Sequence, residues 1–329
     1  MSTEIDGVAT QTGSAAEPLR LLAEDADDLQ IISAALQDAI LRPIDIVWEK
    51  QARTLTIAFS RFCWECGGTR VLSAMQFGDV LAEAQRLGYA ESDPSFDIDG
   101  VDAAHKLAIL TSVAFGCAVD FDAVHIEGIR HISALDIEYA KELGYRIKLL
   151  GIARRNNGGI EQRVHPAMVP IDSPIAAVDG VFNAVVADGD FVEKVTLVGR
   201  GAGAGPTASA VVADLLDVAR GRITPVFGVP SERLARIHTA SPEERRGAYY
   251  LRLMVVDRPG VIADVAAALR DENVSMEAFL QRGRAPGEAV PVVLTTHDTD
   301  EASIQRALKS LDSLEAVLEQ PRLIRIEQF

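Results

Sequence analysis

Cysteine is scarce in this sequence. Three occur, Cys63, Cys66 and Cys117, and no signal-peptide pattern precedes them. An odd number of cysteines without a secretory signal predicts reduced thiols in a cytoplasmic protein rather than a disulfide framework. Cys63 and Cys66 have the spacing of a redox pair but lack its strand-then-helix setting, and a zinc site would need a second such pair. We therefore expect incidental thiols and no metal site.

Long hydrophobic runs and an excess of positive charge are also lacking. No apolar run reaches the roughly 20 residues that a membrane-spanning helix needs. The formal net charge is −16, which disfavours binding to nucleic acid or to an anionic membrane surface. With 329 residues, 48% hydrophobic and 24% charged, the composition is that of a soluble globular protein with room for two or three domains.

The stretch LGYAESDPSFDIDGVDAAHKLAIL, residues 87–110, carries the strongest chemical signal. A proline and several acidic residues in its first half indicate a loop. The apolar run that follows predicts a largely buried helix over residues 101–115. Asp99 stands where the N-cap of this helix is expected, with Asp102 three residues further on.

Asp102 and Lys106 are the charged exceptions on this apolar helix, and their spacing of four places them on one face. A lysine among carboxylates can bind a small zwitterion, because the carboxylates hold its ammonium group while the lysine moves a hydroxyl proton. Alternatively, Asp102 only caps the helix and Lys106 pairs with it on the surface, which stabilises a helix slightly. The spacing alone leaves both interpretations open.

The segment YAESDPSFDIDGVDAAHK resembles the catalytic signature of homoserine dehydrogenases, and the resemblance continues almost without gaps to the last residue. It implies that Lys106 is the catalytic lysine. Glu91 and Asp102 match carboxylates that bind the amino acid. Tyr89 and Asp97 match residues that line the same pocket. The implied reaction reduces aspartate semialdehyde to homoserine with a hydride from NADPH or NADH, in the biosynthesis of threonine, methionine and isoleucine.

The first 77 residues do not share this resemblance. Residues 1–16 are small, polar and without pattern, so we expect a disordered tail. Residues 17–77 predict a small α+β module, which resembles a small uncharacterised bacterial family in LRLLAEDADDLQIISAALQDAI and RFCWE. Its expected elements are a helix at 26–40, a hairpin of strands at 44–48 and 54–59, and a third strand at 70–77.

From about Gly78 to residue 222 the sequence predicts an α/β unit. The resemblance identifies it as an α+β catalytic and dimerisation domain with a mixed sheet, in a homodimer or homotetramer. Upstream there is no strand, Gly-rich turn and helix in series, so we expect a complete Rossmann domain to be absent. Gly67-Gly68-Thr69 resembles the substrate loop that follows this domain in the family, but it lies too close to Val80, so we assign it to the upstream module. Expected helices lie at 80–87, 101–115 and 134–143, and expected strands at 147–153, 160–165, 180–187 and 194–198. We interpret His105 and His165 within these elements as structural.

A glycine-rich run, Gly199-Arg-Gly201-Ala-Gly203-Ala-Gly205, follows a strand and opens a helix expected at 208–220. Its amides suit a phosphate group, and its glycines suit a tight crossover equally well. The resemblance implies that this loop lies near the nicotinamide, which makes Gly199, Gly201 and Gly203 a partial site for NADP or NAD. The residues that would decide between the two cofactors are absent.

After a linker at 223–247, the pattern over 248–329 predicts a ferredoxin-like βαββαβ fold. Strands are expected at 249–256, 274–281, 289–296 and within 314–326, and helices at 260–269 and 301–311. The turn Asp257-Arg-Pro-Gly260-Val-Ile262 resembles that of the ACT domain, an amino-acid-sensing module. The resemblance implies a site for threonine formed by Asp257, Gly260, Val261, Ile262, Asn273 and Gln281.

Two functions remain open at this point. The first is a homoserine dehydrogenase, impaired by loss of a nucleotide domain, because hydride transfer needs the cofactor within roughly 3–3.5 Å of the substrate. The second is a catalytically inert protein of the same descent that senses an amino acid through its ACT domain. Saturable binding of NADPH distinguishes the two.

Overall fold

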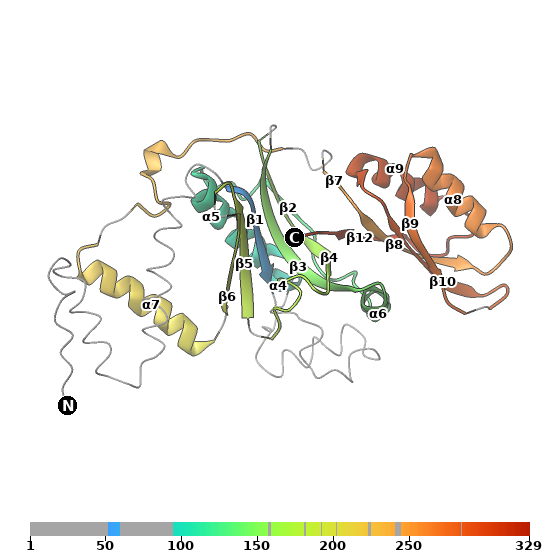
Figure 1. The fold of residues 1–329 in the computed structure, drawn as a ribbon, viewed down its shortest axis with the longest axis horizontal. Helices are drawn as coiled ribbons and strands as arrows, with labels where there is room; N and C mark the ends of the chain where they lie inside the picture. Colours follow the sequence, from blue (N-terminus) through green and yellow to red (C-terminus); the bar gives the residue numbers. More distant parts are fainter. Residues whose placement is uncertain are drawn as a thin grey trace, which may run out of the picture.

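The computed structural model describes residues 52–59, 95–156, 159–180, 182–191, 193–201, 203–222, 225–240, 245–283 and 285–329. Figure 1 shows an elongated molecule with two α/β halves that meet near the middle of one long sheet. We call residues 95–222 together with β1 the catalytic half and residues 245–329 the ACT half, after the roles that the resemblance implies.

The long sheet contains ten strands in the order β6-β5-β1-β3-β4-β12-β8-β10-β9, with β2 also paired to β4. The strands of the catalytic half are β1 (Ala52–Phe59), β2 (Val124–Ile126), β3 (Tyr145–Asn156), β4 (Gly159–Pro170), β5 (Phe182–Gly189) and β6 (Lys194–Arg200). Those of the ACT half are β8 (Tyr249–Val256), β9 (Met276–Gln281), β10 (Ala289–Thr296) and β12 (Arg322–Ile326), and the short β7 (Arg246–Gly247) and β11 (Thr299–Asp300) pair separately. The helices are α4 (Ser95–Ile98), α5 (Val101–Phe115), α6 (Ala134–Glu142), α7 (Ala204–Ala219), α8 (Val261–Asp271) and α9 (Glu301–Asp312), with a 3-10 turn at Ser231–Arg233.

Strands β3 and β4 are longer than expected at both ends and form an antiparallel hairpin. The reason is burial on both faces, which removes the alternation that marks a strand's limits in a sequence. Val164 and Met168 point into the core beneath α5. Ala167 and Val169 point into a second core on the other face, which the segment at 175–178 covers.

Strand β1 lies where the sequence predicts a strand, but its partners differ from the expected ones. It pairs antiparallel with β3 on one side and with β5 on the other. The strand therefore joins the β5–β6 hairpin to the rest of the catalytic sheet, and it does not belong to a separate sheet of its own (Figure 1). Its expected hairpin partner at 44–48 lies outside the described residues, as do the elements expected at 26–40, 70–77 and 80–87.

The ACT half has the predicted βαββαβ order, and its strands form the sheet order β12-β8-β10-β9. Strands β8 and β10 occupy the predicted residues to both ends. Helices α8 and α9 pack side by side and cover one face of this sheet, with Leu253, Val265 and Ile304 in the shared core. Each places an apolar stripe on the sheet at helical spacing.

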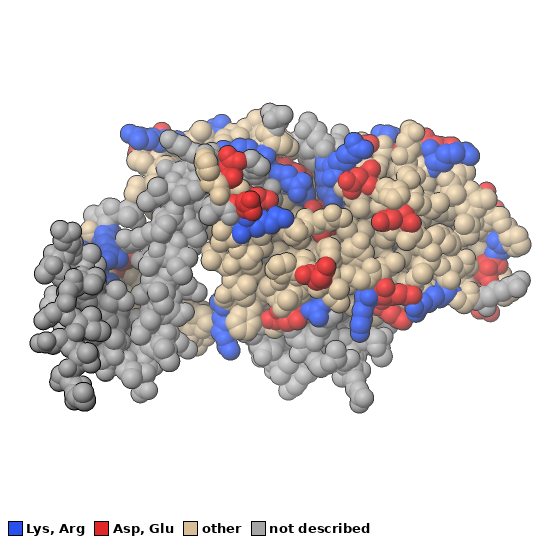
Figure 2. All heavy atoms as spheres, viewed as in Figure 1, with Lys and Arg blue, Asp and Glu red and all other residues tan. Residues whose placement is uncertain are grey.

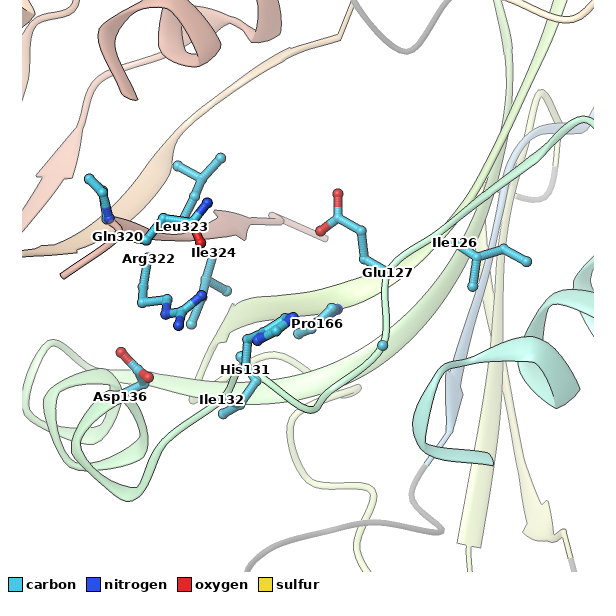
Figure 3. Close-up of a pocket in the computed structure, with 12 residues that line it drawn as sticks. Ile126, Glu127, His131, Ile132, Asp136, Pro166, Gln320, Arg322, Leu323 and Ile324 are labelled. Carbon is cyan, nitrogen blue, oxygen red and sulfur yellow. The ribbon is translucent and has the colours of Figure 1, made fainter. Parts of the chain in front are cut away.

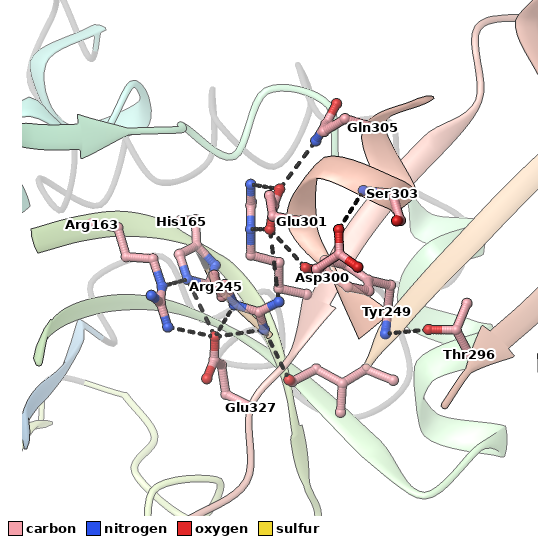
Figure 4. A network of polar contacts seen from close by, with 12 residues as sticks. Arg163, His165, Arg245, Tyr249, Thr296, Asp300, Glu301, Ser303, Gln305 and Glu327 are labelled. Atoms are coloured by element: carbon pink, nitrogen blue, oxygen red, sulfur yellow. Dashed lines mark hydrogen bonds and ion pairs between the residues drawn. The ribbon is translucent and has the colours of Figure 1, made fainter. Parts of the chain in front are cut away.

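The two halves join where β12 pairs antiparallel with β8 and, over Arg325 and Ile326, parallel with β4. A buried network of charged side chains crosses this junction (Figure 4). Arg325 donates to Glu301 at 2.7 Å and to Glu127, across the junction, at 2.8 Å. Glu327 accepts from Arg163 of β4 at 3.1 Å and from Arg245 at 3.0 Å. Buried charges of this kind persist only when paired, so each half supplies groups that the other needs.

His165 on β4 is the structural histidine that the sequence predicts. It is fully buried. Its Nε2 accepts a hydrogen bond from Arg163 Nε at 3.0 Å, so its Nδ1 carries the proton and donates to the Pro166 carbonyl oxygen at 3.0 Å. Burial, together with the nearby Arg325 and Arg163, lowers the pKa of His165 to about 3, which keeps the ring neutral.

We predict that stability falls as the pH drops below about 6.5. In the unfolded chain His165 then binds a proton, whereas in the folded protein its ring stays neutral until about pH 3. The slope is about 1.4 kcal/mol per pH unit for this residue. Burial by itself would raise the pKa of Glu327, but Arg163 and Arg245 lower it to about 2. Its stabilising contribution is therefore present above about pH 4.5 and is lost as the pH falls towards 2.

The measurement is the free energy of urea unfolding at several pH values between 7 and about 5, where the histidine contribution dominates. His165→Gln should flatten the pH dependence, whereas His297→Gln, at an exposed position, should leave it as in the unchanged chain. An equal slope in His165→Gln and the unchanged chain would show that the buried ring is not the source.

Candidate functional site

Helices α4 and α5 carry the residues that the sequence singles out. A single turn of α4 is followed by Gly100, the N-cap of α5, in the left-handed conformation with φ +81°. The expected cap, Asp99, makes no capping hydrogen bond to α5; its carboxylate instead binds Arg130. Glycine is favoured at 100 because of its positive φ, and a Cβ there would lie 3.2 Å from Val164 Cγ1.

Lys106 and Asp102 lie one turn apart on α5, with Lys106 Nζ 2.6 Å from Asp102 Oδ2. Their side chains are 46% and 28% exposed, whereas Leu107 on the opposite face is fully buried. Burial of one face thus fixes the helix, and the polar pair stays accessible on the other. The spacing of four thus places the two residues on one face, as the sequence predicts, and their contact fits both interpretations of the pair.

Of the remaining predicted substrate residues, the structure describes only Asp97. Asp97 is half-buried in α4, which packs against the start of α5. Tyr89 and Glu91 lie outside the described residues. The structure therefore brings Asp102 and Lys106 together and sets Asp97 on the adjoining helix.

A loop at 127–132 holds α4 in place. Arg130 Nη2 lies 2.9 Å from Asp99 Oδ2 and 3.0 Å from Ser95 Oγ. The Ile129 amide donates to the Ile98 carbonyl at 2.9 Å. Gly128 packs so closely that a Cβ would lie 2.5 Å from the Ile98 oxygen. Nothing in the local sequence signals these supports, because their partners lie about thirty residues away.

His105, next to Lys106 and expected to be structural, is exposed on α5. Its ring stacks between two aromatic rings, with centroids 5.7 Å from Phe96 and 4.1 Å from Phe121. This stack flanks the exposed face of α5. It adds a flat apolar surface beside the Lys106–Asp102 pair.

The glycine-rich run forms an exposed loop between β6 and α7. Helix α7 begins at Ala204, four residues earlier than expected, with Gly203 as its N-cap at φ +126°. Gly201 lies against Asn183, where a Cβ would collide with the amide nitrogen. None of the described side chains of α7 is buried, and Leu215 and Val218 are 63% and 75% exposed. The free amides at the start of α7 can face a phosphate or other anion.

The predicted effector residues lie on three segments, namely the turn before α8, the other end of α8 and the end of β9. Gly260 is the N-cap of α8 with φ +96°, and Asn273 at the other end has φ +57°. Asp257 Oδ2 accepts from the Ala285 amide at 2.7 Å, so this carboxylate also closes the loop before β10. The Val261 side chain is buried in the ACT core, so at the turn this residue presents only its backbone. Ile262 is half-buried, and Gln281 is exposed at the end of β9.

None of the helices in the described residues is long and apolar enough to cross a membrane. Figure 2 shows acidic and basic side chains interspersed over the described part of one face. Within those same residues, no three metal-ligating side chains gather into a cluster.

Three families match parts of the chain. Residues 68–216 match homoserine dehydrogenase, residues 249–316 match the ACT domain, and residues 19–101 match a family described as a protein of unknown function (DUF2948). The first match begins at residue 68, upstream of the expected start near Gly78. It therefore includes Gly68 and Thr69, which the sequence analysis assigned to the upstream module.

Relatives and solved structures agree with these matches. The chain is 43% identical over 290 residues to a homoserine dehydrogenase of Pseudomonas aeruginosa, covering 83% of this chain and 67% of the relative. It is 45% identical over 261 residues to that of Neisseria gonorrhoeae, covering 77% and 60%. The crystal structure of a homoserine dehydrogenase from Thiobacillus denitrificans superposes with a TM-score of 0.76 at 44% identity, over 86% of this chain and 65% of that one. The chain thus spans 60% to 67% of the length of these relatives.

We predict that Gly128→Ala destabilises the protein by about 3 kcal/mol, because the new Cβ meets backbone atoms of Ile98 and Asp99 that have no room to move. Gly221→Ala is the control, since φ +68° there costs about 1–2 kcal/mol while the surrounding space is open. The free energy of urea unfolding of both variants checks this. Equal destabilisation would show that the close contact at 128 does not fix α4.

Proposed function

This chain belongs to the homoserine dehydrogenase family, and we propose that it interconverts aspartate semialdehyde and homoserine with NADP or NAD. The observation that carries the proposal is the accessible Lys106–Asp102 pair, held on a buried helix within the segment that matches the family. The chain spans only part of its relatives, so its activity is a matter for experiment.

Lys106 is the acid and base of this proposal. When the aldehyde is reduced, a hydride reaches the carbonyl carbon and the Lys106 ammonium gives a proton to the carbonyl oxygen. In the reverse direction the neutral amine takes the hydroxyl proton of homoserine. Asp102, 2.6 Å from Nζ, orients the lysine. Asp102 also serves with Glu91 as a carboxylate that binds the amino acid. Asp97 and Tyr89 line the same pocket.

A dinucleotide supplies the hydride when it is bound. The exposed loop at Gly199, Gly201 and Gly203 fits one part of such a molecule, because the amides at the start of α7 are unobstructed by a side chain at 201 or 203. In the described part of the chain, parallel strand pairing is confined to β2 with β4 and β12 with β4, so these residues hold no dinucleotide-binding sheet. We propose that the rest of the cofactor site is supplied from outside them.

The ACT half is proposed to bind threonine as a feedback ligand. Gly260 leaves the backbone open at the N-terminus of α8, where amides can receive a carboxylate, and the resemblance adds Asn273, beyond the other end of α8, and Gln281, at the end of β9, as polar groups. We further propose a homodimer or homotetramer that works in the cytoplasm.

We predict that Lys106→Met lowers kcat for homoserine oxidation by about 100-fold or more, because the proton then has no acceptor. Stability should change by less than about 0.5 kcal/mol, since the side chain is 46% exposed. Lys141→Met on α6, another exposed lysine, is the control and should keep full activity. The assay follows reduction of NADP by absorbance.

Fluorescence titration of the unchanged chain with NADPH, with and without homoserine, separates the two candidate functions. Saturable binding supports the dehydrogenase. Absence of binding at millimolar NADPH would overturn it and favour the catalytically inert amino-acid sensor.

For the regulatory site, we predict that calorimetric titration with threonine gives saturable binding that Gly260→Val removes, because a branched side chain is strained at φ +96° and covers the turn. Gly283→Val, at φ +74° in open space, is the matched control. Threonine binding that persists in Gly260→Val would place the ligand elsewhere.

A further inference from the structure

A cavity of about 390 Å³ lies at the junction of the two halves. Its walls are the loop at 126–136, Pro166 of β4, and the segment at 320–324 that enters β12 (Figure 3). The cavity exists because β12 pairs with β4 only from Arg325 onwards, so the two strands diverge before that residue. It is separate from both the Lys106 pair and the turn at Gly260, neither of which contributes to its walls.

The acidic side chains on its walls are already engaged. Glu127 accepts from Arg325 at 2.8 Å and lies 2.9 Å from the His125 ring nitrogen. Asp136 accepts from Arg252 Nε at 2.7 Å and from the Tyr250 hydroxyl at 3.1 Å. These carboxylates have little left to offer a ligand.

The basic side chains on the walls, in contrast, are not paired with groups in the described part of the chain. Figure 3 shows Arg322 and His131 reaching into the space between the two halves. Within the described part of the chain, no ion pair or hydrogen bond involves the Arg322 guanidinium or the His131 ring. Arg322 is only half-exposed, so its charge is partly removed from water with no protein partner. This leaves an open guanidinium fork, which suits a carboxylate.

The rest of the lining is apolar and includes Ile132, Leu323 and Ile324. Small-molecule sites of about 300–1,000 Å³ typically combine such walls with a few convergent polar groups. From this arrangement we propose that the junction cavity binds a small aliphatic carboxylate, with the carboxylate on Arg322 and His131 and the hydrocarbon part against these apolar side chains. The free acid and the corresponding α-amino acid share this chemistry.

The location of the cavity adds a consequence that rests on the proposed function. Its wall includes Gly128 and His131, and the same loop binds Ile98 and Asp99 just before α5. A ligand that fixes this loop also fixes the start of the helix that carries Lys106. If the substrate also binds better when this loop is fixed, the ligand and the substrate favour each other's binding by linkage.

The test is calorimetric titration of the full chain with three molecules of one carbon skeleton: 3-methylbutanoate, L-valine and L-valinol. We expect both carboxylates to bind in the millimolar range or tighter, and the alcohol, which lacks the carboxylate, not to bind. Binding of the free acid alone would identify a site for simple carboxylates, and equal or tighter binding of valine would identify an amino-acid site. The assay needs no activity, so its result is independent of the dehydrogenase proposal.

Arg322→Gln should weaken binding of 3-methylbutanoate about tenfold or more, because a charge-assisted hydrogen bond is worth roughly 1.5–3 kcal/mol. His131→Gln should weaken it less. Arg270→Gln, at a 73% exposed position on α8, is the matched control and should bind as the unchanged chain does. Circular dichroism and thermal unfolding verify that each variant is folded. No binding of either carboxylate at millimolar concentration, or unchanged affinity in Arg322→Gln, would overturn the proposal.

Discussion

The short parallel pairing of β12 with β4 is the constraint on which the rest of this structure depends. It places Arg325 between Glu127 of the catalytic half and Glu301 of the ACT half, and it brings Glu327 to Arg163. A buried charge that loses its partner is strongly destabilising, so neither half can separate without exposing or stranding several charges. The two halves are therefore best understood as one folding and regulatory body, in which the loop at 127–132 touches both the junction and α4.

The parts of the fold that the sequence predicted well are those set by local pattern. Strands β8 and β10 are short, mostly apolar runs that occupy the predicted residues, and α5 runs from Val101 to Phe115 as expected. The errors arose where distant residues decide the outcome. The partners of β1 are about 100 residues away in sequence for β3 and about 130 for β5, and no local signal encodes that choice. Asp99 is a residue type that often caps helices, but its carboxylate is bound by Arg130 from a distant loop.

The candidate site divides in the same way. The contact between Asp102 and Lys106 follows from a helix and a spacing of four, so the sequence was sufficient to predict it. The roles of these residues came from family resemblance, because spacing alone suits an ordinary surface ion pair equally well. Gly128 and Arg130, which position α4, have no signature of their own. Nothing in the sequence singles out the junction cavity, and only the structure shows that its carboxylates are paired and that Arg322 is open.

The positions of β1 and β12 inside the sheet also determine when the protein can fold during synthesis. β1 is synthesised early but needs β3 and β5, which emerge about 100 and about 130 residues later. β12 is synthesised after β4 and β8, the two strands that it joins. The junction between the halves therefore forms last, and until then β4 and β8 each have an unpaired edge. Such non-local pairing slows folding and leaves strand edges exposed in the meantime. Nascent chains of this protein should consequently depend on chaperones more than its size would suggest.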